Sequence, residues 1–128
     1  MQVTRGGGFG GFESPDGRYF YYAKAEAFPA SLWRLPAAGG AEEEVVQPLR
    51  GWLHFAVVEG GICFVPPRAA GGTYTLQFYG FADRRVRTLA SLCERLAFGF
   101  SVSADGRWAA FPCYEFKGGD LILIEGFR

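Results

Sequence analysis

A short turn motif occurs three times in this chain at nearly constant spacing. Asp16-Gly17 and Asp105-Gly106 occupy equivalent places in the similar stretches SPDGRYFYYAK and SADGRWAAFPC. Glu59-Gly60, in VVEGGICFVPP, stands between them, 43 residues after Asp16 and 46 residues before Asp105. A fixed interval of this size indicates that one structural unit is repeated along the chain.

Each copy of the motif is followed by the segments that a four-stranded unit needs. An apolar run of strand length comes directly after the turn, and a further strand with leucine at the same place, Leu32, Leu76 or Leu121, follows it. A more polar strand, EEEVVQPL or RRVRTLASL, then ends the first two copies, whereas the third copy stops at Arg128 without one. No long stretch keeps a helical apolar period, so the sequence predicts an all-β protein.

Units of this length and strand count are typical of β-propeller blades, which stack side by side because one blade cannot bury both of its faces. We therefore predict a half-propeller of three four-stranded blades. The predicted blades are residues 9–49, residues 51–93, and residues 97–128, the last without its outer strand.

The same stretches carry a resemblance to a known family. SPDGRYFYYAK with LWRLPAAGG, and SVSADGRWAAFP with DLILIEGFR, resemble the WD40-like, TolB-type β-propeller repeats of bacteria over nearly the whole chain. The tail from Ser103 is also similar to the C-terminal propeller that bacterial winged-helix regulators carry as a sensory or interaction half. The chain has no winged-helix segment, so the resemblance implies a propeller without DNA binding.

Three blades are too few to close a ring, because propellers use about four to eight. Two chains would supply six, so we predict a homodimer with its two-fold axis along the central channel. Residues 1–5 resemble an outer strand and are predicted to complete the last blade of the partner chain. In the alternative, the chain is a fragment and the missing blades lie upstream.

The repeated turns are predicted to be structural. An aspartate at this place can accept a hydrogen bond from the backbone two residues on, and the following glycine adopts a positive φ without strain. We assign this role to Asp16, Gly17, Glu59, Gly60, Asp105 and Gly106, although the glutamate of the middle copy loses the aspartate's bond.

Candidate ligand-binding residues lie on the loops predicted to share one face of the ring, where aromatic and basic side chains suit a protein, peptide or small organic ligand. They are Arg50, Trp52, His54, Arg68, Tyr114, Glu115, Phe116 and Lys117. Phe9, Trp52 and Phe98 share one repeat column, which favours packing between blades. The sequence offers no catalytic constellation, because the single histidine, His54, has no matched acidic cluster.

Composition excludes several other classes of protein. Thirteen basic and thirteen acidic residues cancel, so neither a nucleic acid nor a membrane is an expected partner. The three cysteines lack metal-ligand spacing and are predicted to be free, mostly buried thiols, with no metal and no cofactor. No signal peptide or membrane-spanning run is evident, which predicts a cytoplasmic protein.

These observations favour a non-enzymatic binding or interaction module. One alternative is a small propeller hydrolase or lyase with a channel site formed in the dimer, which requires converging carboxylates and a histidine. The other is a structural remnant of a larger propeller protein. Fold alone does not choose among them, because propellers host many unrelated activities.

Overall fold

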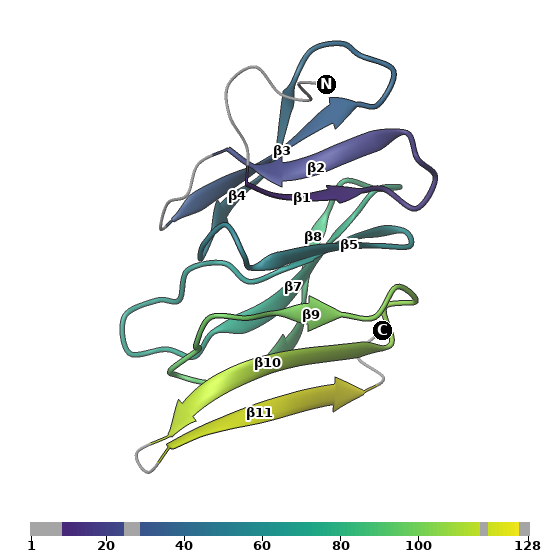
Figure 1. The fold of residues 1–128 in the computed structure, drawn as a ribbon. Coiled ribbons are helices and arrows are strands. Elements are labelled where there is room, and N and C mark those ends of the chain that lie inside the picture. Colours follow the sequence, from purple (N-terminus) through teal and green to yellow (C-terminus); the bar gives the residue numbers. More distant parts are fainter. Residues whose placement is uncertain (1–8, 25–28, 116–117, 126–128) are drawn as a thin grey trace.

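The computed structural model describes residues 9–24, 29–115 and 118–125, whose strands form three antiparallel sheets (Figure 1). The first sheet has the order β1 (Phe9–Glu13), β2 (Tyr19–Ala23), β3 (Ala30–Pro36) and β4 (Glu43–Leu49). The second has the order β5 (Phe55–Val58), β6 (Gly61–Phe64), β7 (Thr75–Gly80) and β8 (Val86–Ser91). The third has the order β9 (Ser101–Val102), β10 (Trp108–Glu115) and β11 (Gly118–Glu125). No helix occurs within the described ranges, in agreement with the predicted all-β class.

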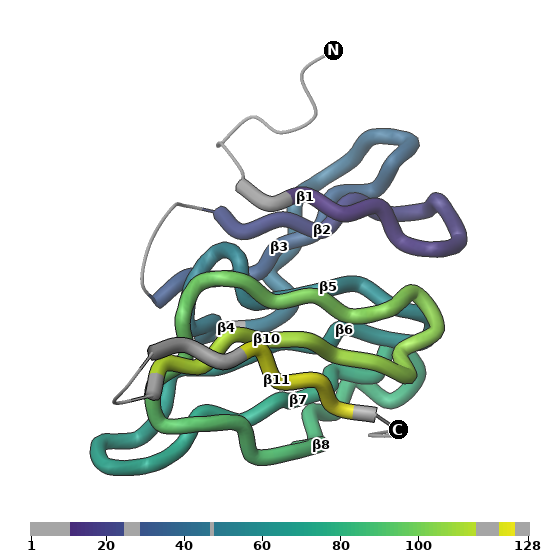
Figure 2. Tube along the Cα trace, turned by 60° about the horizontal axis from the view of Figure 1, so that its bottom comes forward, coloured from purple at the N-terminus to yellow at the C-terminus, as the bar shows by residue number. Residues whose placement is uncertain are grey.

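The sheets are stacked in chain order, with the first at the top of Figure 1, the second in the middle and the third at the bottom. Figure 2 shows the third sheet, coloured green to yellow, lying across the second, coloured teal. The leading strands contact one another in succession, since β1 touches β5 and β5 touches β9. The leading edges of the three sheets therefore converge along one line.

A core of apolar side chains joins the first sheet to the second. Tyr21 and Leu32 contribute from the first sheet, and Phe55 and Ile62 contribute from the second, all fully buried. The ring of Tyr21 also stacks on Phe81, with 5.6 Å between the ring centroids. Burial of such side chains stabilises each by roughly 1.5–3 kcal/mol, so this interface holds the first two sheets together.

The other face of the second sheet is covered by the third. Residues of a strand point alternately to the two faces, so Ile62 packs toward the first sheet while Cys63 packs with Val58, Leu76 and Ala109 toward the third. All four residues of β6 are buried. A strand that is apolar on both faces needs a neighbour on each side, and in the second sheet this need is met.

The repeated turns have a common geometry in the first and third copies. The Asp16 carboxylate accepts hydrogen bonds from the Ser14 hydroxyl at 2.6 Å and the Arg18 amide at 3.0 Å, and Gly17 has a φ of 72°. These bonds hold the pKa of the Asp16 carboxyl below its usual range, the Ser14 bond most strongly. The corresponding residues of the third copy, which form the same bonds, are Ser103, Asp105, Gly106 and Arg107.

The middle copy forms a tighter turn. Val58 pairs with Gly61 across the hairpin, so Glu59 and Gly60 alone connect β5 to β6. Gly60 has a φ of 83°, a backbone conformation that glycine adopts without a steric penalty. The glycine therefore keeps its place in all three copies while the number of turn residues differs.

The prediction of three free thiols is wrong for two of the cysteines. Cys93 and Cys113 form a disulfide, with 6.4 Å between their Cα atoms and a sequence separation of 20 residues. A bridge between Leu96 and Cys113 lays the segment that follows β8 alongside β10, which brings the two thiols together. Cys63 is a buried thiol outside this disulfide, as predicted.

The third sheet has three described strands where the other two sheets have four. Its outermost strand, β11, exposes Leu121 and Leu123 with 73% and 59% of their surface accessible. Residues 1–5, which were predicted to supply an outer strand, lie outside the described residues. The edge of β11 is thus unpaired within the described part of the chain.

We expect reduction of the Cys93–Cys113 disulfide to lower the free energy of unfolding by about 3 kcal/mol, because a 20-residue closure would no longer restrict the unfolded chain. Chemical denaturation with and without dithiothreitol measures this change. The double variant Cys93→Ser/Cys113→Ser is the control and should not respond to the reductant. Equal stability of the oxidised and reduced wild-type protein would contradict the expectation.

We expect Gly61→Ala to destabilise the fold by about 2 kcal/mol or more, because its Cβ would overlap the Tyr79 carbonyl oxygen and the Phe78 ring. Gly11→Ala is the matched control, since its Cβ would lie 3.9 Å from the Tyr21 carbonyl oxygen in ordinary contact. Urea denaturation of both variants measures the difference. Similar losses in the two variants would show that the close approach at Gly61 is not a constraint.

Candidate functional site

The two ends of the stacked sheets carry different sets of loops. The three repeated turns gather at the right-hand end of Figure 1 and line one open hollow of about 610 Å³. Its lining consists of Ser14, Pro15, Asp16, Glu59, Gly60, Phe81, Ala104 and Asp105. The turns predicted to be equivalent are thus neighbours in space, and Asp16 and Asp105 use one carboxylate oxygen each to hold their own turns.

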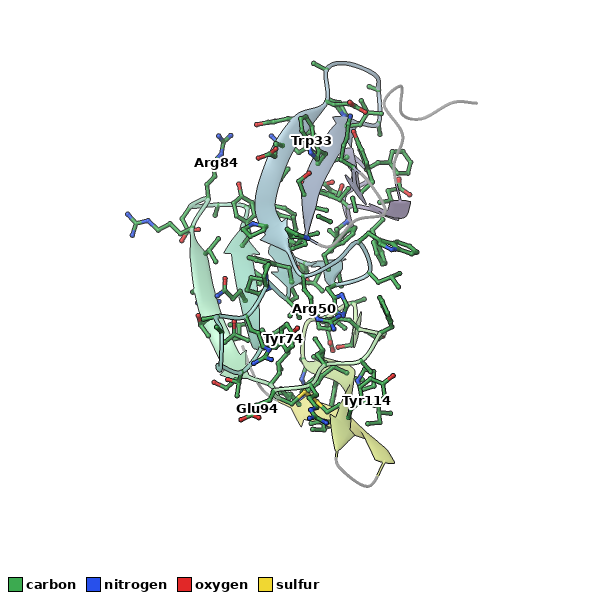
Figure 3. The ribbon with its side chains drawn as sticks, turned by 90° about the vertical axis from the view of Figure 1, so that its left-hand side faces the viewer. Trp33, Arg50, Tyr74, Arg84, Glu94 and Tyr114 are labelled. Atoms are coloured by element: carbon green, nitrogen blue, oxygen red, sulfur yellow. A yellow bond between two sulfur atoms is a disulfide. The ribbon has the colours of Figure 1, made fainter. Side chains whose placement is uncertain are left out.

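The opposite end is formed by the segments that lead into β5 and β9 and by the loop between β6 and β7. Figure 3 views the molecule from this side, with Arg50 and Tyr74 close together near the middle and Tyr114 below them. The backbones of these segments are tied to one another. Arg50 donates to the Val65 carbonyl at 2.8 Å, and Tyr74 donates to the Cys93 carbonyl at 2.8 Å. These backbone hydrogen bonds fix the positions from which the side chains at this end project.

Arg50 is the centre of this end. Its Nη2 donates to the Leu96 carbonyl at 2.6 Å, and its Nη1 lies 3.1 Å from Nε2 of His54. The guanidinium carbon lies 4.9 Å from the centre of the Tyr74 ring and 5.9 Å from that of Phe98. One half-buried cation thereby contacts segments from both the second and the third sheet.

His54 is fully buried beside this cation. A guanidinium can only donate hydrogen bonds, so Nε2 of His54 accepts and the ring proton sits on Nδ1. Burial and the charge of Arg50 lower the pKa of His54 to about 4, and the nearby Ala97 backbone opposes this shift only in part. His54 is therefore neutral near pH 7 and serves as an acceptor for Arg50.

Arg68 approaches Tyr74 from the β6–β7 loop. Its Nη1 donates to the Gly72 carbonyl at 2.7 Å, and its guanidinium carbon lies 5.7 Å from the centre of the Tyr74 ring. Hydrogen bonding to Arg50 and the charges of Arg50 and Arg68 outweigh burial and lower the pKa of the Tyr74 hydroxyl below its usual range. These three residues, with Pro29 and Pro67, line an open pocket of about 370 Å³ that we call the Arg50–Tyr74 pocket.

The predicted ligand-binding residues are only partly brought together. Arg50, His54 and Arg68 belong to one cluster, whereas Trp52 is half-buried against the core between the first two sheets. Tyr114 is 60% exposed at the end of β10. Glu115 ends β10 with a side chain that the structure does not describe, and Phe116 and Lys117 lie outside the described residues.

The sequence analysis predicted the burial of one residue at this end incorrectly and did not identify another residue as a candidate. Phe98 was expected to pack between blades, but in the segment before β9, 59% of its surface is exposed, with its ring centroid 6.3 Å from that of His54. Tyr74 was not a candidate. Its place in a loop outside the repeat columns, six residues after Arg68, is the signal that could have identified it.

No group of three or more His, Cys, Asp or Glu side chains in residues 9–24, 29–115 and 118–125 is arranged to hold a metal ion. Over the same ranges, no helix has the length and apolar character needed to cross a bilayer.

Comparison with known proteins identifies the fold. No protein-family model and no curated protein matches the sequence. The structure is similar to TolB from Acinetobacter baumannii, a β-propeller protein, with a TM-score of 0.70 and 17% identity over 98% of this chain and 32% of that one. It is also similar to the tricorn protease, with a TM-score of 0.58 and 12% identity over 94% of this chain and 12% of that one.

A third similar structure is a eukaryotic initiation factor, with a TM-score of 0.53 and 13% identity over 92% of this chain and 30% of that one. The chain thus spans about a third or less of the length of each of these proteins. At such low identities the likeness establishes a propeller-like all-β fold and nothing about activity. It agrees with the resemblance to TolB-type repeats.

We expect stability to fall as the pH is lowered from about 7 to about 5, because the unfolded chain protonates His54 near 6.5 and the folded chain only near 4. The stabilising difference is fully present above the unfolded pKa and is lost on acidification, by about 2 kcal/mol over this range. Urea denaturation at several pH values measures it. His54→Gln keeps an acceptor for Arg50 but does not titrate, so a pH slope as steep as that of the wild type would contradict the assignment.

Proposed function

We propose that this chain is a non-enzymatic binding module, half of a β-propeller that pairs with a second copy to close a six-bladed ring. In this proposal each of the three sheets is one blade, and the loops at the Arg50 end form part of a ring face that receives a ligand or a protein segment. The propeller-like fold supports a binding or interaction role in general. The pairing rests on the surface of the third sheet.

The observation that carries the proposal is an uncovered apolar face on the third sheet. In the β10–β11 register, Ala109 and Phe111 lie on the face that packs against the second sheet and are buried. Leu121 and Leu123 pair with the intervening residues of β10 and therefore lie on the opposite face, where they are largely exposed. A contiguous apolar surface of this kind favours association.

The proposed cover is the first sheet of a second copy. The face of the first sheet that points away from the second sheet carries Trp33 and Lys24, both half-buried, with the Lys24 ammonium 4.8 Å from the centre of the Trp33 ring. Stacking this face on β10–β11 of the partner, twice around a two-fold axis, gives each outer sheet a neighbour. Residues 1–5 would then pair with the open edge of β11 in the partner chain.

The same surface also fits the alternative in which further blades of a longer chain cover the third sheet. The two arrangements differ in the mass of the assembly formed by this chain. The hydrolase or lyase alternative draws no support from His54, which is buried, neutral and engaged with Arg50. The cytoplasmic location stays a prediction. The Cys93–Cys113 disulfide speaks against it, because disulfides are more frequent in oxidising compartments than in the cytosol.

We expect sedimentation equilibrium at micromolar concentration to give the mass of two chains. The double variant Leu121→Lys/Leu123→Lys should give the mass of one chain or a mixture of both, because charges on the exposed face of the third sheet oppose its burial. Val86→Lys is the matched control, since Val86 is 51% exposed on the outer strand β8, away from the proposed interface. A wild-type mass of one chain would contradict the dimer.

Deletion of residues 1–5 separates the strand exchange from the stacking of sheet faces. We expect the truncated chain to dimerise at least about tenfold more weakly, because the open edge of β11 would lose its partner strand. If the truncated and complete chains dimerise equally well, the strand exchange is wrong even though the dimer stands.

A further inference from the structure

The positive charges at the Arg50 end have no acidic partners among the described residues. The ion pairs within the described residues, Lys24 with Glu42 and Arg34 with Glu43, both lie in the first sheet. Arg50 is held by a carbonyl, a neutral imidazole and aromatic rings. Charged groups that leave bulk water are normally paired, so a half-buried guanidinium without a carboxylate is suited to an anion from outside.

The hydrogen-bonding groups of Arg50 are also not all used. Nη1 and Nη2 carry two N–H groups each, so two N–H groups remain for the Tyr74 hydroxyl and a ligand beyond the bonds to His54 and the Leu96 carbonyl, whereas Nε is buried and cannot reach a ligand. Arg68 uses Nη1 on the Gly72 carbonyl, which leaves its remaining N–H groups on an exposed side chain. Both guanidinium groups contact the ring of Tyr74, so two cations and one hydroxyl meet in a small volume.

The Arg50–Tyr74 pocket adds apolar walls to this charge. Pro29 and Pro67 line it together with the Tyr74 ring, and its volume of about 370 Å³ lies in the range of small-molecule sites. In Figure 3 the Arg50 and Tyr74 side chains lie next to each other on the face turned toward the viewer. The pocket therefore offers cationic donors on one side and apolar surface on the other.

We propose that the Arg50–Tyr74 pocket binds the carboxylate of a small organic acid, with Arg68 and Arg50 facing the carboxylate and the apolar body of the acid resting on Pro29, Pro67 and the Tyr74 ring. The lowered pKa of the Tyr74 hydroxyl reports the same positive field. This inference deepens the proposed binding function, but the pocket lies within one chain and does not need the dimer.

A carboxylate fits these groups better than a phosphate does. The planar guanidinium fork matches the two oxygens of a carboxylate in one plane. A phosphate dianion is more strongly hydrated, and the two prolines and the tyrosine ring offer it no hydrogen bonds in exchange for lost water. A carboxylic acid with one apolar ring could pair its charge with the guanidinium groups and pack its ring against the apolar walls of the pocket.

Titration with benzoate, followed by changes in the amide NMR spectrum, tests the proposal. We expect benzoate to perturb the amide signals around Tyr74 and Arg68 and to bind at least about tenfold more tightly than the uncharged benzamide. Inorganic phosphate should bind more weakly than benzoate. The perturbed signals should be the same in the dimer-weakening variant Leu121→Lys/Leu123→Lys, so failure of this site and failure of the proposed pairing are distinguishable.

Three variants assign the binding to these residues. Arg68→Gln should weaken benzoate binding about tenfold and Tyr74→Phe by a few-fold, whereas Arg85→Gln, which removes an equal charge from the exposed turn after β7, should leave it unchanged. Arg50→Lys should weaken binding despite keeping the charge, because lysine has no planar fork. A thermal melt of each variant shows that the fold is retained.

Several outcomes would overturn the proposal. They are the absence of any perturbation at about 20 mM benzoate, equal binding of benzoate and benzamide, tighter binding of phosphate, and equal losses in Arg68→Gln and Arg85→Gln.

Discussion

The structure depends on sheets that are apolar on both faces and therefore need a neighbour on each side. The second sheet shows the constraint satisfied: Ile62 faces one neighbour, Cys63 faces the other, and the whole of β6 is buried. The third sheet shows it half satisfied, with Phe111 buried on one face and Leu123 exposed on the other. The stacked order of the sheets and the proposed association with a second copy both follow from this requirement.

Stacking the sheets also decides what the loops can do. Loops that are distant in the sequence reach the same end of the stack, where Arg50 contacts the Leu96 carbonyl, the Tyr74 ring and His54. His54, the residue whose type suggests catalysis, is a neutral acceptor, because its burial and the cation beside it both oppose its protonation. The anion recognition proposed for this end therefore does not rely on proton transfer by His54.

Much of the fold was predictable from the sequence because it depends on local pattern. Turn residues such as Asp16 and Gly17, the apolar runs after them, and the repeated leucines at Leu32 and Leu76 mark the strands without knowledge of their partners. The disulfide was not predictable, because the pairing of Cys93 with Cys113 depends on the segment after β8 lying beside β10. The exposure of Phe98 was missed for a related reason, since a repeat column records equivalent position and not equivalent burial.

The sequence by itself determined the repeat, the all-β class and the places of the turns, because each depends on the local residue pattern and on the spacing of the turns. Only the tertiary structure decided which loops meet to form the Arg50–Tyr74 pocket. Arg50 lies between β4 and β5 and Tyr74 between β6 and β7, and nothing in the sequence indicates that the two are close. It also decided that the outer face of the third sheet has no cover within the described chain. Contacts between distant segments depend on how whole sheets pack, a property that no short stretch of residues contains.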